Sequence, residues 1–452
     1  MSVTAIRGGA VDAPLDRARR KAYGRLIPFV FVCYAIAYID RANVAFAKLT
    51  MAKDLGFNDD IFGTGFGIFF LGYVLLEVPG AILVERWSAR KMISRIMVSW
   101  GLVAGLTALV KTPGQFYGMR FLLGLAEAGF FPGAIVYLTH WFPARDRARA
   151  LALLVIASPI AQMVSMRVSA PILAIGTTET INGVAVTTPP MFGLHGWQLM
   201  YIVWAVPAVI LGLLVLFKLT DRPAQARWLS AEERDALEAE LARERTAQGV
   251  AQHMSIGEAL RNPAVLLLAL TNFLVTSAHY GIEAFQPTIL KSWFNLSLAS
   301  VSWAAMPVFF AILVGLLGVS WSSDRRGERW LHTVVPMFWG AAVLILTMLA
   351  RADYALTIVL FALAVMGVRS YLTPFYALPK LFLEGPAAAG AIGFINAVAN
   401  LGGFVGPKTL GALSKASGGS YVTGFLYLAA TTALAGVCIL VLRAYYGRRA
   451  AA

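Results

Sequence analysis

Residues 26–49 read LIPFVFVCYAIAYIDRANVAFAKL, an apolar run interrupted by only three charged side chains. A membrane-spanning helix needs about 20 mostly apolar residues. Further runs of this kind centre near residues 72, 101, 127, 162 and 208 and, after a polar gap, near 276, 311, 341, 366, 399 and 432. Together with the run near residue 37, they predict an all-α membrane protein with twelve transmembrane helices in two six-helix bundles.

The composition agrees with a membrane protein. Of the 452 residues, 58% are hydrophobic and 14% are charged, whereas a soluble domain is nearer half apolar and a quarter charged. Long soluble chains split into domains and do not thicken a single core, so lipid is the solvent that accommodates this excess. The net charge of +14 is explained by cytoplasmic loops, which accumulate Lys and Arg, and nucleic acid is not an expected partner.

The order of the runs predicts five segments. These are a cytoplasmic tail at 1–25, a six-helix bundle at 26–220, a cytoplasmic linker at 221–262, a second six-helix bundle at 263–443, and a cytoplasmic tail at 444–452. Within the linker, Ser230 and Glu233 form a capping-box pattern that predicts an amphipathic surface helix. The first 25 residues are polar and basic and lack the pattern of a cleavable signal peptide.

The basic residues predict how the chain lies in the membrane. If the N-terminus is inside, the short cytoplasmic segments carry roughly 19 Lys and Arg and the outside loops about six, the asymmetry that sets orientation. We therefore expect a multi-pass protein of the cell inner membrane with both termini in the cytoplasm.

The two halves repeat one loop. Glu85, Arg86 and Arg90 follow the second apolar run, and Asp324 and Arg325 follow the eighth. Internal repeats are typical of secondary transporters, whose substrate sites lie near the membrane midplane between the repeats. We predict a conformational or structural role for these residues, although a basic cytoplasmic loop alone could produce the same pattern.

Ionisable residues inside the apolar runs are the strongest functional signal. Each costs roughly 2.5–3.5 kcal/mol at mid-membrane on insertion scales, and such residues face the bundle interior and pair with one another. We expect this of Asp40, Glu77, Glu127, Glu283, Arg41, Arg120, Arg167 and Arg369.

Spacing groups some of these residues on common helix faces. Arg120 and Glu127 are seven residues apart and share a face. Tyr34, Tyr38 and Arg41 share a second face, and Asn396 and Asn400 share a third. Arginine binds both oxygens of a carboxylate through its planar fork. Burial and a neighbouring Arg shift the pKa of an acid in opposite directions, a combination that suits a site that takes up and releases protons.

Other interpretations of these residues stay open. Glu77 could be structural and pair with Arg86 or Arg90. Arg167 and Glu283 could form a structural ion pair or lie nearer the membrane surface. Arg369 could bind a second acidic group of the substrate or neutralise Glu283. His279 is expected to be packed and satisfied.

Other protein classes are disfavoured. The segment from Gly402 to Thr409 suggests a phosphate loop but lacks the Gly-Lys step and the preceding strand, so we expect no ATP site. The sequence shows no nucleophile–base or metal-ligand constellation, so a membrane enzyme is not expected. It also shows no attached soluble signalling domain, so a receptor is not expected. We therefore expect no catalytic residue, no metal site and no cofactor other than protons as the coupling ion.

The chain resembles the major facilitator superfamily and, within it, the anion:cation symporter family. The stretches that carry the resemblance are Arg25–Phe29 with Tyr38–Val44, Gly72–Tyr73 with Glu77–Gly80, Arg120–Phe130, Asp221–Pro223 with Trp228–Leu229, Pro287–Leu290, and Gly393–Asn396 with Asn400–Pro407.

The resemblance implies the major facilitator fold, alternating access, and import of an organic anion with protons. The expected substrates are sugar acids, hydroxy acids, dicarboxylates or aromatic carboxylates. Sodium coupling or export are the alternatives. We expect a monomer in a lipid bilayer.

The resemblance also suggests roles for individual residues. Asp40 and Glu127 resemble the proton-coupling pair, with Arg120 linking them, and Arg41 resembles the substrate anchor. The full set of predicted substrate-binding residues is Arg41, Tyr38, Tyr73, Gln162, Arg369, Tyr371, Asn396 and Asn400. The chain departs from the family pattern at Ala81 and Glu85, and Arg167, Glu283 and Arg369 are not part of that pattern.

Overall fold

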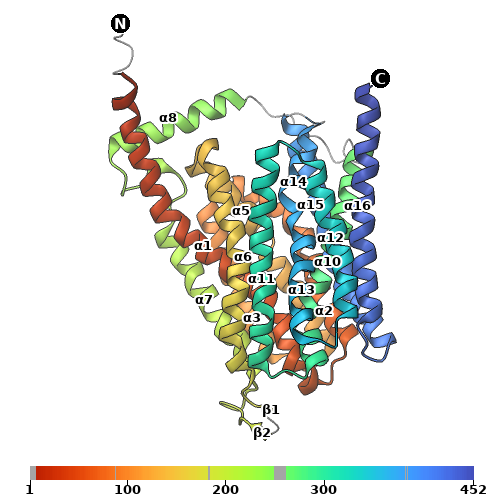
Figure 1. Cartoon of the computed structure of the whole chain (residues 1–452). Coiled ribbons are helices and arrows are strands. Elements are labelled where there is room, and N and C mark those ends of the chain that lie inside the picture. The colour runs from red at the N-terminus through yellow and green to blue at the C-terminus, as the bar shows by residue number, and fades with distance from the viewer. Residues whose placement is uncertain are drawn as a thin grey trace.

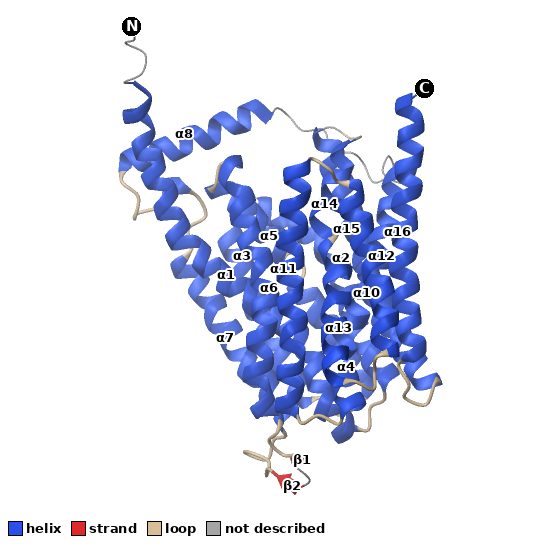
Figure 2. Ribbon diagram, viewed as in Figure 1, coloured by secondary structure: helices blue, strands red, loops and turns tan. Residues whose placement is uncertain are grey.

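The computed structural model describes residues 7–86, 88–181, 184–248, 261–381, 383 and 385–451. Within them, twelve helical segments are long and apolar enough to cross a membrane, as the apolar runs predict. Figures 1 and 2 show these helices side by side in one elongated body. The all-α prediction is therefore confirmed, and the only described strands are β1 (Thr178–Ile181) and β2 (Val184–Thr187).

The first half of the chain supplies six spans. They are formed by α1 (Arg7–Leu55), α2 (Asp59–Arg86), α3 (Ala89–Leu106) extended by η1 (Thr107–Leu109), α4 (Pro113–Glu127) with α5 (Phe130–Trp141), α6 (Ala144–Leu173) and α7 (Gly196–Lys218). The fourth span breaks at Gly129, whose φ of 87° is left-handed and favours glycine. Because of this break, Glu127 ends α4 in the middle of the span.

The second half supplies the other six. They are formed by α10 (Pro263–Phe294), α11 (Leu298–Arg326), α12 (Trp330–Leu349), α13 (Tyr354–Ser370) with α14 (Leu372–Ala377) and η3 (Leu378–Leu381), α15 (Gly385–Ala416) and α16 (Val422–Ala451). Here the tenth span is interrupted after Ser370, which leaves Arg369 and Tyr371 on either side of the interruption.

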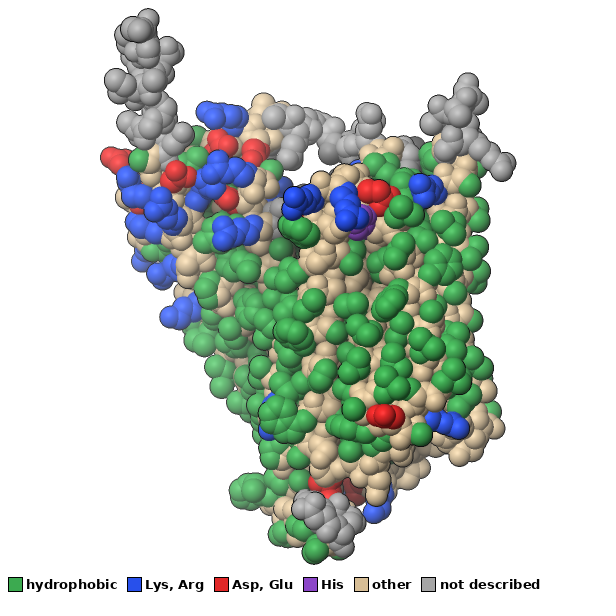
Figure 3. Space-filling view, viewed as in Figure 1, with side chains coloured by type: hydrophobic (Ala, Val, Ile, Leu, Met, Phe, Trp, Pro, Cys, Tyr) green, Lys and Arg blue, Asp and Glu red, His purple; other side chains and the backbone are tan. Residues whose placement is uncertain are grey.

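The molecule has two distinct ends. Both ends of the chain and α8 (Ala231–Gln248) lie at one end, named here the linker end, and the β1–β2 hairpin lies at the other, named here the hairpin end (Figure 1). Between them, the surface in Figure 3 is mostly apolar, and charged side chains gather toward the two ends. Large apolar side chains in the middle of the spans, such as Leu122, Val206 and Phe310, are exposed, as expected for a surface that faces lipid.

The linker begins with a short 3-10 helix, η2 (Pro223–Gln225), and continues as the predicted helix α8. The capping box is present, because Ser230 Oγ accepts from the backbone N–H of Glu233 and the Glu233 carboxylate accepts from that of Ser230. Glu233 also accepts a 2.7 Å hydrogen bond from Lys21, and this bond holds the pKa of Glu233 below its usual range. Of the residues expected as an N-terminal tail, 7–25 are therefore the first part of α1, and Lys21 there binds α8.

The repeated loops are partly described. In the first, Asp221 accepts hydrogen bonds from Ser88 Oγ at 2.8 Å and from the backbone N–H of Arg90 at 2.9 Å. The side chains of Glu85 and Arg86 lie outside the described residues. In the second loop, Arg329 pairs with Asp324 at 2.6 Å, and the guanidinium of Arg325 lies over the Trp321 ring. The first loop thus fastens the start of the linker to the first bundle.

The two halves meet closely at the hairpin end. A Cβ added to Gly63 would lie 2.3 Å from the carbonyl oxygen of Pro407, so α2 and α15 touch backbone to backbone. Asp59 accepts hydrogen bonds from Ser414 and Tyr421 of the second half and pairs with Lys48 of the first. Asp60 pairs with Lys408 at 2.8 Å. These contacts, named here the hairpin-end interface, close the molecule on that side.

Candidate functional site

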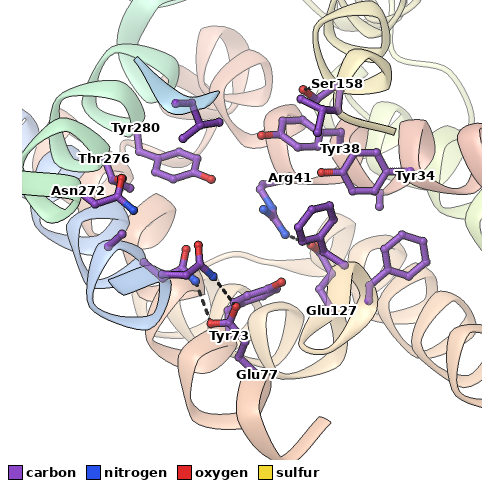
Figure 4. A pocket seen from close by; sticks show the side chains of 18 of the residues that line it. Tyr34, Tyr38, Arg41, Tyr73, Glu77, Glu127, Ser158, Asn272, Thr276 and Tyr280 are labelled. Atoms are coloured by element: carbon purple, nitrogen blue, oxygen red, sulfur yellow. Dashed lines mark hydrogen bonds and ion pairs between the residues drawn. The ribbon is translucent and has the colours of Figure 1, made fainter. Parts of the chain in front are cut away.

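A cavity of about 280 Å³ lies between the two halves on the linker side of the hairpin-end interface. It is lined from the first half by Tyr34, Ala37, Tyr38, Arg41, Tyr73, Glu77, Glu127, Phe130, Phe131, Val155 and Ser158, and from the second by Asn272, Thr276, Tyr280, Arg369, Tyr371, Leu372, Tyr376, Asn396, Ala399 and Asn400. Figure 4 shows their side chains pointing into a common space. Aromatic walls with a few charged groups are typical of a small-molecule site.

Arg41 and Glu127 form the charged pair of the first half. The Arg41 guanidinium donates to a Glu127 carboxylate oxygen at 3.0 Å (Figure 4). It also lies within 5.6 Å of the ring centroids of Tyr38, Phe69 and Tyr73, a cation–π arrangement. The position of Glu127 beside Arg41 follows from the break at Gly129 and from Gly124, where an added Cβ would lie 2.0 Å from the Phe69 carbonyl oxygen.

Glu77 on α2 forms hydrogen bonds with the second half of the chain. One carboxylate oxygen accepts from Asn396 Nδ2 at 2.8 Å and the other from Asn400 Nδ2 at 2.9 Å (Figure 4). The predicted pairing of Glu77 with Arg90 is wrong, because Arg90 binds Asp221 instead. Asn396 and Asn400 lie one helical turn apart on α15, so both amides reach the same carboxylate.

Behind the two asparagines, a chain of hydrogen bonds runs through the second half. Tyr371 Oη donates to Asn272 Oδ1 at 2.7 Å, and Asn272 Nδ2 donates to Tyr376 Oη at 3.1 Å. Tyr376 Oη in turn donates to Asn396 Oδ1 at 3.2 Å. This chain ends on Glu77, and each member fixes the orientation of the next.

Arg369 forms no described hydrogen bond or ion pair with these groups. It lines the cavity at the end of α13 among the rings of Tyr38, Tyr280 and Tyr371, and its Nε makes no hydrogen bond. Among the described residues, no carboxylate lies within ion-pair distance of it. Arg369 and Glu283 therefore form no direct ion pair, but Glu283 acts on Arg369 electrostatically at longer range, so neutralisation of Glu283 by Arg369 stays a prediction. Glu283 lies 3.1 Å from His279 on its own helix.

Arg167 lies outside the cavity. It donates to Ser302 at 2.8 Å and stacks over Trp303 at 3.9 Å from the ring centroid. The suggested ion pair between Arg167 and Glu283 is therefore wrong. Arg167 joins α6 to α11 instead.

Three predicted site residues also lie outside the cavity lining. Asp40 accepts a 2.7 Å hydrogen bond from Trp100 Nε1 inside the first bundle. Arg120 donates to the Gly65 carbonyl oxygen at 3.2 Å, and Gln162 is buried in α6. Within the described part of the chain, Arg120 forms no ion pair with Asp40 or Glu127, but its charge acts on both carboxylates at longer range, so the predicted link stays a prediction. Proton coupling by Asp40 and Glu127 stays a prediction.

The remaining predicted substrate residues come together, and sequence reasoning missed several neighbours. Arg41, Tyr38, Tyr73, Arg369, Tyr371, Asn396 and Asn400 all line the cavity. The missed polar or aromatic lining residues are Phe130, Phe131, Ser158, Asn272, Thr276, Tyr280 and Tyr376. Asn272 carried a usable signal, because an amide inside an apolar run is costly in lipid unless it is bonded.

Two six-helix halves around a shared polar cavity are the architecture of many secondary transporters. Residues 30–292 match the family model described as Major Facilitator Superfamily. The chain belongs to the major facilitator superfamily, so it is a transporter and the expectation that it is not an enzyme is confirmed.

The chain is also similar to individual known transporters. A putative tartrate transporter from Agrobacterium vitis is 41% identical over 442 residues, covering 96% of this chain and 93% of its own. A quinolone resistance transporter from Acinetobacter baumannii is 37% identical, with coverage of 87% and 88%. A solved bacterial homologue of the human lysosomal transporter Spinster, inward-facing and unoccupied, superimposes with a TM-score of 0.71 at 16% identity and covers 95% of this chain and 96% of that one.

Proposed function

We propose that the protein imports a small organic anion together with protons. The observation that carries the proposal is Arg369, a guanidinium in the central cavity with no carboxylate beside it in the described structure. No carboxylate lies within ion-pair distance of this guanidinium among the described residues, and Glu283 acts on it only at longer range, so an anionic substrate can bind it directly. Arginine binds a carboxylate through two parallel hydrogen bonds.

The substrate class follows from the two arginines. Arg41 and Arg369 lie on opposite halves of one cavity, so a hydroxy acid or dicarboxylate gripped by both would couple binding to the relative position of the bundles. Similarity to a putative tartrate transporter supports the same class, because tartrate carries two carboxylates. The aromatic walls formed by Tyr34, Tyr38 and Phe130 also suit an aromatic carboxylate.

Proton coupling is assigned to the acid of the first half. Glu127 neutralises Arg41 when no anion is present. A proton on Glu127 removes this negative charge and leaves the Arg41 guanidinium to the substrate. Asp40, one residue before Arg41, is the second proposed proton site.

The distribution of Lys and Arg favours an inner-membrane protein whose linker end faces the cytoplasm. With this orientation, the hairpin-end interface seals the cavity from the outside. The structure then represents the state from which substrate is released inward.

The test is uptake into proteoliposomes. Purified protein is reconstituted, and entry of radiolabelled tartrate and of a panel of sugar acids and aromatic carboxylates is followed under an imposed inward proton gradient, with and without sodium. Accumulation driven by protons alone supports the proposal. Accumulation that requires sodium, or no uptake of any acid, overturns it.

Export is a second candidate, because the chain is 37% identical to a quinolone resistance transporter. The same vesicles distinguish the two. Import predicts that an inward proton gradient drives acid inward, whereas proton-driven export predicts that an inward gradient depletes a quinolone preloaded in the lumen.

A further inference from the structure

Glu77 binds the same kind of donors that a substrate carboxylate needs. Its two oxygens each accept one amide, from Asn396 and Asn400, and all three residues line the central cavity. Two N–H donors that converge on one carboxylate form the arrangement by which a protein recognises a bound carboxylate. The Glu77 carboxylate, which belongs to α2, therefore already occupies the two amide donors that α15 presents to the cavity.

We propose that Glu77 is a built-in competitor of the substrate, and that a proton on Glu77 transfers the Asn400 amide from Glu77 to the anion. This inference rests on the proposed function for the identity of the ligand as an organic anion. It adds a residue that sets the affinity for that anion and its dependence on pH.

The direction of the hydrogen bonds explains why Asn400 is the amide that is released. An ionised carboxylate accepts hydrogen bonds only, whereas a protonated one has a single O–H to donate. The carbonyl oxygen still accepts one amide, but the oxygen that carries the proton is a poor acceptor, so the amide on it leaves or turns its carbonyl toward the O–H. Asn396 is held in place because its Oδ1 accepts from Tyr376, which in turn accepts from Asn272. Asn400 has no such bond in the described structure, so it is free to turn.

The groups around Glu77 allow this exchange. Arg41 on α1 contributes a positive charge at Glu77, and Tyr73 on α2 and Tyr376 on α14 lie near enough to feel the charge of the Glu77 carboxylate. Glu127 lies near Tyr73 and is neutralised by Arg41. Since Arg41 is shared between Glu127 and the substrate, arrival of an anion at Arg41 adds negative charge beside Glu77 and favours its protonation.

The first part of the test needs no ligand. Infrared difference spectra between mildly acidic and mildly basic pH are recorded on the purified full chain and on Glu77→Gln. We expect a carbonyl band of a protonated carboxyl in the native protein at acidic pH that is absent from Glu77→Gln. If the spectra of the two proteins are identical, Glu77 does not take up a proton and the inference is wrong. Glu283→Gln, which removes a buried carboxylate outside the cavity lining, is the matched control and should retain the band.

The second part measures binding of tartrate and of the acid panel by calorimetry at both pH values. Glu77→Gln mimics the protonated state, so at basic pH it should bind about tenfold more tightly than the native protein, the effect of one hydrogen bond to a charged group. Adding Asn400→Ala to Glu77→Gln should remove this gain. Asn400→Ala alone should weaken binding mainly at acidic pH.

The outcomes separate the two proposals. If Glu77→Gln binds no more tightly than the native protein at basic pH, or if the gain survives loss of Asn400, the competitor role is wrong while organic-anion binding stands. If the infrared band is present but no acid binds any variant, the proposed function is wrong and Glu77 remains a proton-exchanging residue.

Discussion

The two halves of the cavity hold their arginines differently. In the first half, Arg41 is paired with Glu127 and surrounded by the rings of Tyr38, Phe69 and Tyr73. In the second half, Arg369 has aromatic neighbours but no carboxylate partner among the described residues. The first arginine is directly paired by the protein, whereas the second has only the longer-range charge of Glu283. If the proposed function holds, protons exchange in the first half, and the anion binds Arg369 directly and Arg41 once Glu127 is protonated.

The rest of the lining shows the same division. The carboxylates of the lining, Glu77 and Glu127, both come from the first half, whereas the second half contributes neutral amides and hydroxyls such as Asn272, Asn396 and Tyr376. Apart from Arg369, groups that can change charge thus face groups that only donate or accept hydrogen bonds. This difference predicts that substitutions on the two sides will have different kinetic signatures.

Removal of the unpaired arginine should have the largest effect. Arg369→Gln eliminates the positive charge that no described carboxylate pairs with directly, and losing one partner of a buried charge pair costs about 2–5 kcal/mol. We expect the affinity for a dicarboxylate to fall by about a hundredfold or more, and the affinity for its monoacid analogue to fall much less. Calorimetric titration with such a pair measures this. Equal losses for both acids would mean that Arg369 does not contact the second carboxylate.

Arg41→Lys should have the next largest effect, although it preserves the charge. A lysine has no planar fork and cannot bond both oxygens of a carboxylate. We expect binding to weaken by about tenfold to a hundredfold for monoacids and diacids alike. Unchanged affinity in the same titration would exclude Arg41 as the substrate anchor. Its role would then be limited to the ion pair with Glu127.

Sequence reasoning succeeded where a helix period or a cost in lipid applies. The twelve apolar runs and the shared face of Tyr34, Tyr38 and Arg41 follow from these rules alone. It does not predict which group Asp40 contacts. Consecutive residues of a helix point about 100° apart, so Asp40 and Arg41 do not both face the cavity, and the coupling role of Asp40 stays a prediction. Asp40 instead meets Trp100 inside the bundle.

The partners of Glu77 could not be found from spacing. Asn396 and Asn400 lie more than 300 residues further along the chain, and no local pattern connects them to it. Tyr280 and Tyr376 were missed because an aromatic residue in an apolar run also fits an ordinary packed position. The contact between α2 and α15 could not be predicted from the sequence. It depends on glycines such as Gly63, whose close approach to Pro407 is visible only in the packed structure.

Neutralising the acids of the first half should separate coupling from binding. Glu127→Gln and Asp40→Asn should both lose accumulation driven by a proton gradient, while Glu127→Gln retains substrate exchange because Arg41 is still present. If both acids are protonated in each cycle, import of a monoanion moves one positive charge inward, and 100 mV adds about 2.3 kcal/mol of driving force.

Current on addition of a monoanion to membranes that contain the protein measures this stoichiometry. An inward positive current supports two protons per anion. Its absence would leave one titrating carboxylate, of which Glu127 is the one beside the substrate arginine. A variant Glu127→Gln that still accumulates substrate against its gradient would contradict coupling through that residue.

The smallest effect is expected where the two halves meet, at the hairpin-end interface. Asp60→Asn breaks the pair with Lys408, whose side chains are 25% and 40% exposed, and an exposed ion pair contributes about 0.2–1 kcal/mol. Asp59→Asn should open this end more readily, because Asp59 binds Lys48, Ser414 and Tyr421 together. Distances between spin labels on the hairpin-end termini of α2 and α15 would measure the open fraction, with about two- to fivefold more of it expected in Asp60→Asn. Since α2 and α15 also touch through the backbone at Gly63, both variants should keep a mostly closed hairpin end.

If Asp60→Asn opened this end as far as Asp59→Asn, closure would depend on the summed charge of the surface and not on the buried bonds of Asp59. The halves would then be held together chiefly by electrostatics that salt can screen.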